Sequence, residues 1–230
     1  MNRLIAIAAA LVAALPVPAS AGTDPVAARK VLSDYASCIV RREPAVAKAW
    51  VLSGKFLSRG DSALGKLSQR ECIDVQKTAM LRAGGIMMRG SLAQALFDRD
   101  QAVLTATDFA AAPALYWDEP SAVATTGKDG KPLPQAAIEA QTRAVSSKSA
   151  EIQLARMGEC VVRANAAGSR AVLTSAAATS AELDALKALT PQLSTCVPTG
   201  QTVAFDRVTL RGALALAYYR LATAVSGSAG

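Results

Sequence analysis

Four cysteines are the residues whose type and spacing most directly define chemistry in this chain. They are Cys38, Cys72, Cys160 and Cys196. Four thiols can pair in three ways, or can serve a redox centre or a metal ion. The chain has no Cys-x-x-Cys motif and no histidine, which argues against zinc, copper and haem ligation and removes the usual general base. We therefore predict two structural disulfides, with no metal and no cofactor.

One short segment concentrates aromatic and acidic side chains: Tyr116, Trp117, Asp118 and Glu119, followed by Pro120. Adjacent carboxylates do not face each other, whereas glycosidase chemistry needs two acids across a defined gap. The favoured interpretation is a loop that packs its aromatic side chains onto helices. The alternative is a ligand region, because connecting loops carry many binding sites.

Other catalytic patterns are missing from the sequence. It contains no Gly-x-Ser-x-Gly motif, no phosphate-binding P-loop and no Gly-x-Gly-x-x-Gly motif. An enzyme built on this chain would need an unfamiliar arrangement of Asp, Glu, Lys or Tyr. We therefore assign no catalytic residue.

The cysteines belong to a pattern that occurs twice in register, 122 positions apart. Cys-Ile-Val-Arg at 38–41 returns as Cys-Val-Val-Arg at 160–163, and Arg-Gly-Ser-Leu-Ala at 89–93 returns as Arg-Gly-Ala-Leu-Ala at 211–215. One further cysteine lies inside each copy. The duplication favours the pairs Cys38–Cys72 and Cys160–Cys196, because a disulfide within each copy lets that copy fold as a unit. Loops of this size stabilise by about 3–4 kcal/mol each in the chain-entropy model.

Two pairs of arginines recur with the pattern. Arg41 and Arg163 fall near predicted helix ends, where a cation complements the helix dipole; the alternative is an anion clamp. Arg89 and Arg211 each precede a glycine. These arginines are expected to pair with buried carboxylates such as Asp74, or else to face an anionic ligand.

The two glycines that follow them, Gly90 and Gly212, lie inside predicted helices. A glycine there costs about 1 kcal/mol relative to alanine. Its presence in both copies predicts a point of close approach to another helix.

Apolar spacing predicts helices throughout. In the first copy, apolar residues at 31, 35, 38 and 39 form one face of a predicted helix. This helix should end near Arg42, because Pro44 disfavours helical backbone at the residue before it. In the second copy, Asn165 and Gly168 are the residues expected to stop the matching helix. A middle helix is expected over 61–71. Its counterpart in the second copy begins with a capping box at 179–182, and Pro191 is expected to bend that helix or end it early. The last helices carry stripes at 88, 92 and 96 and at 210, 214 and 218, the second one capped by Asp206.

Residues 99–150 differ from the two copies and are expected to form a linker with partial helix over 135–149. The resulting organisation is a signal peptide at 1–21, a helical repeat at 22–98, the linker at 99–150, a second repeat at 151–225 and a disordered tail at 226–230.

The first 21 residues resemble a secretory signal. Arg3 precedes an uncharged apolar run over 4–15, and Ala-Ser-Ala ends at Ala21, before Gly22. Cleavage after Ala21 would place the mature chain in the periplasm or outside the cell. No later segment is apolar enough to span a membrane. The favoured interpretation of the net charge of +7 is ordinary solubility, because the basic residues are scattered along the chain. The alternative is an envelope protein or an anionic envelope component as partner, and export argues against nucleic acid.

The duplicated unit resembles small exported alphaproteobacterial proteins. The likeness rests on Cys-[Ile/Val]-Val-Arg, a second cysteine and Arg-Gly-[Ser/Ala]-Leu-Ala, and covers about 35–97 and 157–219. It implies no activity, ligand or catalytic residue.

These observations predict an all-α protein of two homologous, disulfide-linked helical units in a pseudo-twofold arrangement. The favoured function is a non-enzymatic binding or interaction module. Two alternatives remain open: an enzyme acting on an envelope polymer through Asp118 or Glu119, and a structural or stress-related envelope protein.

Overall fold

The computed structural model describes residues 25–55, 62–72, 85–197 and 206–227. In these ranges every regular element is a helix, apart from an isolated antiparallel bridge between Thr126 and Pro132. The prediction of an all-α fold is confirmed. The first-copy helices are α1 (Pro25–Arg42), α2 (Pro44–Ser53), α3 (Ser62–Leu67), the 3-10 turn η1 (Arg70–Cys72) and α4 (Gly85–Asp100). The others are α5 (Gln135–Ala164), α6 (Ala166–Thr174), α7 (Ser180–Ala188), α8 (Thr190–Cys196) and α9 (Arg207–Gly227).

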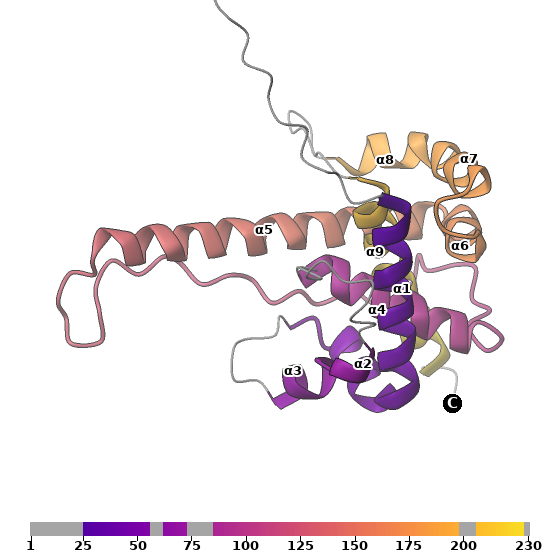
Figure 1. Cartoon of the computed structure of the whole chain (residues 1–230). Coiled ribbons are helices and arrows are strands. Elements are labelled where there is room, and N and C mark those ends of the chain that lie inside the picture. Colours follow the sequence, from indigo (N-terminus) through magenta and orange to yellow (C-terminus); the bar gives the residue numbers. More distant parts are fainter. Residues whose placement is uncertain (1–24, 56–61, 73–84, 198–205, 228–230) are drawn as a thin grey trace, which may run out of the picture.

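Helices α4 and α9 cross at the centre of the helical body (Figure 1). Helices α1 and α2 pack on α4, whereas α5 and α6 pack on α9. Helix α9 is buried on nearly every side from Leu210 to Ala222, including Tyr218 and Tyr219. The core is rich in alanine, whose small side chain lets helix backbones approach closely while burying little apolar area. The two disulfides add to the stability of such a core.

Several helix ends lie where their residues predict them. Helix α1 ends at Arg42, two residues before Pro44. Asn165 ends α5 and also caps α6, since its side chain accepts a hydrogen bond from the Gly168 N–H. Thr179 accepts from the Glu182 N–H at the start of α7, and the Thr209 N–H donates to Asp206 at the start of α9. These caps satisfy N–H groups that the helices themselves leave unpaired.

Other boundaries differ from the prediction. Gly168 lies inside α6 rather than ending a helix. The expected middle helix of the first copy is divided into α3 and η1, and Pro191 begins a separate helix, α8. Ser226 and Gly227, expected in a disordered tail, form the end of α9. Proline suits the first turn of a helix because it has no N–H to leave unpaired, so Pro191 starts a helix as readily as it ends one.

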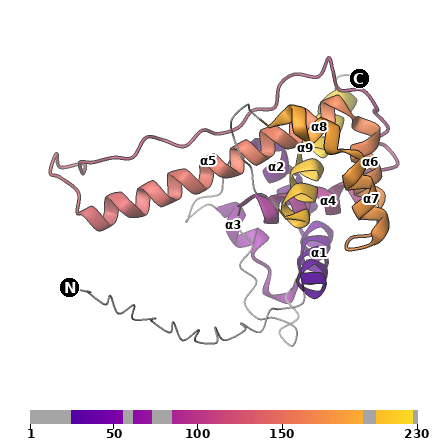
Figure 2. The same ribbon diagram turned by 90° about the horizontal axis from the view of Figure 1, so that it is seen from above.

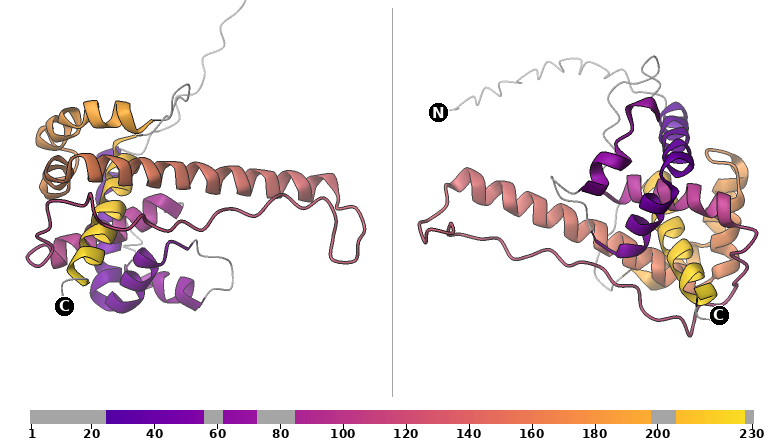
Figure 3. Two further views of the ribbon diagram at one scale, coloured as in Figure 1. Left: turned by 180° about the vertical axis from the view of Figure 1, so that it is seen from behind. Right: turned by 90° about the horizontal axis from the view of Figure 1, so that it is seen from below.

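The boundary expected at residue 151 falls inside one continuous helix. Helix α5 has 30 residues and joins the predicted linker helix to the first helix of the second copy. Figures 2 and 3 show its N-terminal half extending beyond the other helices, with the preceding segment of chain running back beside it. This half of α5 and the part of the linker that runs beside it therefore form an arm on the helical body. The signal segment at 1–21 lies outside the described residues.

Candidate functional site

The cysteines form the two predicted bonds. Cys38 pairs with Cys72 and Cys160 with Cys196, and no free cysteine remains. Each bond joins the first helix of a copy to the segment that follows its middle helix. Among the described residues, no group of three His, Cys, Asp or Glu side chains could hold a metal ion. The cysteines thus serve as covalent links between helices.

The adjacent acids of the linker, Asp118 and Glu119, form ion pairs on the surface. Asp118 accepts from Lys148 at 3.0 Å, and Glu119 pairs with Arg156. Both partners belong to α5. Tyr116 is exposed, whereas Trp117 is buried between the linker and the body. The expectation that this loop packs its aromatic side chains inward is therefore met by Trp117 and not by Tyr116.

Arg89 and Arg211 have matching roles at matching positions. Arg89 donates to the main-chain carbonyls of Trp50 and Val51, at the C-terminal end of α2. Arg211 donates to the carbonyls of Val172 and Leu173, at the end of α6. Donors and acceptors alike are 122 positions apart. Each arginine satisfies carbonyls that a helix end leaves without an internal partner.

Arg211 also pairs with a buried carboxylate, Glu182. The Glu182 carboxylate is fully buried and accepts from Arg29 at 2.5 Å and from Arg211 at 3.1 Å. It accepts in addition from the N–H of Ala178. Although burial alone would raise the pKa of Glu182, the bonds from Arg29 and Ala178 and the charges of both arginines lower it. Glu182 therefore stays ionised between the two cations.

Asp74, the carboxylate suggested by the sequence, lies outside the described residues. From the sequence, Glu182 is predicted only as part of the capping box at 179–182. Its second role had no signal in the sequence, because Arg29 and Glu182 are 153 positions apart and only folding brings them together.

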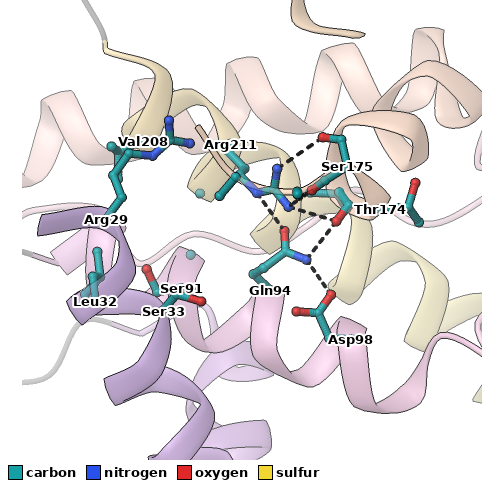
Figure 4. Close-up of a pocket in the computed structure, with 15 residues that line it drawn as sticks. Arg29, Leu32, Ser33, Ser91, Gln94, Asp98, Thr174, Ser175, Val208 and Arg211 are labelled. Carbon is teal, nitrogen blue, oxygen red and sulfur yellow. Dashed lines mark hydrogen bonds between the residues drawn. The ribbon is translucent and has the colours of Figure 1, made fainter. Parts of the chain in front are cut away.

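A pocket of about 310 Å³ lies beside this ion-paired group, where α1, α4, α9 and the segment joining α6 to α7 meet (Figure 4). Its floor includes the crossing point of α4 and α9. The lining residues are Arg29, Leu32, Ser33, Gly90, Ser91, Gln94, Asp98, Leu173, Thr174, Ser175, Ala176, Ala177, Val208, Arg211 and Gly212. The pocket is therefore built from both halves of the chain, and polar and apolar residues line it in similar numbers.

Hydrogen bonds fix the polar wall of the pocket. Gln94 accepts from Arg211 at 3.2 Å and donates to Asp98 at 2.7 Å and to the Leu173 carbonyl at 3.1 Å (Figure 4). Arg211 reaches Ser175 at both its hydroxyl and its carbonyl oxygen. Asp98 lies at the exposed end of this network. The wall is thus preorganised, and Asp98 is its accessible charge.

Arg41 and Arg163 differ in their exposure and in their contacts. Arg41 is exposed at the end of α1. Arg163 pairs with Glu159 and donates to the carbonyls of Phe109, Ala112 and Pro113 in the linker. The predicted position near a helix end holds for both. In the second copy, however, the arginine anchors the linker to α5.

Arg89 and a further arginine, Arg220, are buried next to Trp117. The guanidinium carbons of Arg220 and Arg89 lie 4.3 Å and 5.9 Å from the centre of its ring. Burial lowers the pKa of Arg89 to about 9, with a further contribution from the charge of Arg220. Burial likewise lowers the pKa of Arg220 to about 10. Both remain cations at neutral pH, and the face of the indole ring attracts them.

Comparison with protein-family models, with curated proteins and with solved structures found no match. In the part of the chain that the structure describes, no helix has the length and apolar character needed to cross a membrane. The geometry of the pocket is therefore the basis for a functional proposal.

Proposed function

We propose that this chain is an exported, non-enzymatic binding protein and that the pocket over the α4–α9 crossing is its binding site. The observation that supports the proposal is the fixed polar wall formed by Gln94, Arg211 and the carbonyls at the end of α6. A wall whose side chains are already ordered loses little conformational entropy when a ligand binds. The volume of about 310 Å³ lies at the lower end of the range for ligand sites.

The ionisable groups at the pocket favour binding over catalysis. Glu182 is buried, ionised and bonded to two arginines, so it is a poor proton acceptor at neutral pH. Arg29 and Arg211 are held by the same carboxylate. Asp118 and Glu119, the acids that motivated an enzymatic alternative, pair with α5 and do not line this pocket.

The proposal includes export to the periplasm or the medium, after cleavage behind Ala21. It is supported by the signal-like pattern at 1–21 and by two disulfides, which persist in oxidising compartments. The expected partner is a component of the cell envelope. We also propose that the two copies are related by a pseudo-twofold axis near Gly90 and Gly212. The matching bonds of Arg89 and Arg211 support this arrangement.

Site-specific photo-crosslinking tests the proposed function. A photoreactive amino acid replaces Ala177 at the pocket in one variant and Asp129 on the arm in a matched control, and both are expressed in an exporting cell. We expect an adduct of defined mass at Ala177 that is missing at Asp129. Adducts of equal yield at both positions, or none at Ala177, would overturn the proposal.

A further inference from the structure

The chain already contains a groove filled by a peptide, and that peptide is its own linker. The segment 115–118 runs in extended form over the helical body. It lies at the place that the 122-residue repeat relates to the open pocket. The Leu115 N–H donates to Glu159 at 3.0 Å, and the Asp118 N–H donates to the carbonyl of Gly54 at 3.2 Å. Main-chain bonds combined with an anchoring side chain are a common mode of peptide recognition.

Trp117 is the anchor of this segment. Its side chain is 5% exposed, and its indole N–H donates to Glu159 at 3.4 Å. The carbonyl of the preceding residue, Tyr116, accepts from Arg220 at 2.9 Å. One aromatic ring and three main-chain groups are thus recognised within four residues.

The residues that hold the linker correspond to residues of the open pocket. Gly54, Arg89 and Arg220 all contact the linker. At the repeat-related positions, 122 residues away, the chain has Ala176, Arg211 and Asp98, and all three line the pocket. The open pocket is therefore the counterpart, in the other copy, of the groove that the linker fills.

The open counterpart differs from the filled groove in its charged residues. Asp98 stands where the filled groove has Arg220. Arg156 of α5, which pairs with Glu119 of the linker, corresponds to Asp34 on α1, which pairs with Lys30 and lies outside the pocket lining. Where Lys148 holds Asp118, the first copy has Val26. The filled groove thus offers cations to the two acids of the linker, whereas the lining of its counterpart has the carboxylate of Asp98 in place of the cation Arg220.

The arginines inside the pocket do not reverse this polarity. Arg29 and Arg211 are only 10% and 12% exposed, and both are bonded to Glu182. Asp98 is exposed and carries the accessible charge. Opposite charges across a binding surface set the choice of partner more than they set the affinity.

We propose that the open pocket binds an extended peptide segment of a partner protein in which an aromatic residue is followed by basic residues. This inference rests on the proposed binding role of the pocket. The aromatic side chain takes the place that Trp117 has in the filled groove. The basic residue faces Asp98.

Two synthetic octapeptides test the inference on the full mature chain with its disulfides intact. One copies residues 113–120, Pro-Ala-Leu-Tyr-Trp-Asp-Glu-Pro. The other has lysine in place of both acids. Fluorescence anisotropy at low salt measures the affinity of each labelled peptide. We expect the lysine peptide to bind at least about tenfold more tightly, because like charges across an interface are strongly unfavourable.

Two substitutions with equal charge change locate the binding site. Asp98→Arg should weaken binding of the lysine peptide at least about tenfold, whereas Asp129→Arg on the arm should leave it unchanged. Both residues are exposed, and thermal unfolding of each variant checks that its fold is retained. Tighter binding of the acidic peptide, or equal effects of the two substitutions, would overturn the inference.

The peptide experiment and the crosslinking experiment together distinguish failure of the peptide inference from failure of the proposed function. If neither peptide binds while Ala177 still gives its specific adduct, the peptide inference is wrong and the binding role of the pocket stands. If the adduct is missing as well, both proposals fail.

Discussion

Gly90 and Gly212 face each other where α4 crosses α9, and the contact between them is unequal. A Cβ atom added to Gly90 would lie 2.4 Å from the Cα of Gly212 and 2.6 Å from its carbonyl oxygen. A Cβ added to Gly212 would lie 3.5 Å from the Cα of Gly90, an ordinary contact distance. The same glycine of the repeated pattern is therefore required in one copy and replaceable in the other.

Gly90→Ala should destabilise the protein by about 1–3 kcal/mol. The added methyl group meets main-chain atoms, so α4 and α9 must move apart and lose packing along their crossing. Gly212→Ala is the matched control. It should be neutral or stabilise by up to about 1 kcal/mol, since alanine is the better helix former and has room. Urea unfolding followed by circular dichroism gives both free energies, and equal losses would contradict the asymmetry.

This close approach was predictable from the sequence, but its asymmetry was not. A glycine inside a helix in both copies signals a tight helix crossing, because the residue otherwise costs stability. The distances at that crossing depend on how α4 and α9 tilt, and packing over the whole body sets the tilt. The disulfide pairs were predictable for the same reason as the glycines, namely the duplication, whereas the caps at Thr179 and Asp206 were predictable from local spacing.

The pocket was not predictable, because its residues come from four separated segments. Gln94 and Asp98 lie on an ordinary helix surface in the sequence, and nothing in their spacing distinguishes them. The opposite is true of Asp118 and Glu119. They form the most conspicuous acidic pair of the linker, and the fold pairs them with Lys148 and Arg156.

Removing either disulfide should cost a similar amount of stability. Cys38→Ser with Cys72→Ser opens a loop of 34 residues, and the corresponding change at Cys160 and Cys196 opens one of 36. Loop-closure entropy depends only weakly on length, so each double variant should lose about 3–4 kcal/mol. Denaturant unfolding without reductant measures both. A loss of less than about 1 kcal/mol in one variant would show that its unfolded chain stays compact without the bond.

Glu182→Gln should destabilise the protein by about 3–5 kcal/mol near neutral pH, because it leaves Arg29 and Arg211 buried without their common anion. Asp184→Asn is the control. Asp184 lies on the same helix, but it is exposed and pairs only with exposed Lys187. Its loss should stay below about 1 kcal/mol.

The effect of Glu182→Gln should also depend on pH. The pKa of Glu182 lies below its usual value of 4.5 in the folded chain. The stability that its charge contributes is therefore complete above about pH 4.5 and is lost as the pH falls through the folded pKa. The difference between wild type and variant should shrink on going from pH 7 to pH 3, as measured by thermal unfolding. A difference that grows in acid would mean that the folded chain raises this pKa.

Trp117→Ala should empty the groove that the linker fills. The side chain is buried and packs on the guanidinium groups of Arg220 and Arg89, so its loss leaves a cavity beside two buried cations. Truncation of a buried aromatic side chain costs about 3–5 kcal/mol. Tyr116→Ala is the matched control, because the Tyr116 side chain is exposed and its carbonyl, which Arg220 holds, is kept.

Amide hydrogen exchange distinguishes loss of packing from loss of the linker contact. In Trp117→Ala, the N–H groups of Leu115 and Asp118 should exchange faster, since the bonds to Glu159 and Gly54 depend on the segment staying in place. In Tyr116→Ala they should exchange at the wild-type rate. Wild-type exchange in both variants would show that main-chain bonds alone hold the linker. An aromatic anchor would then not be needed in the open pocket either.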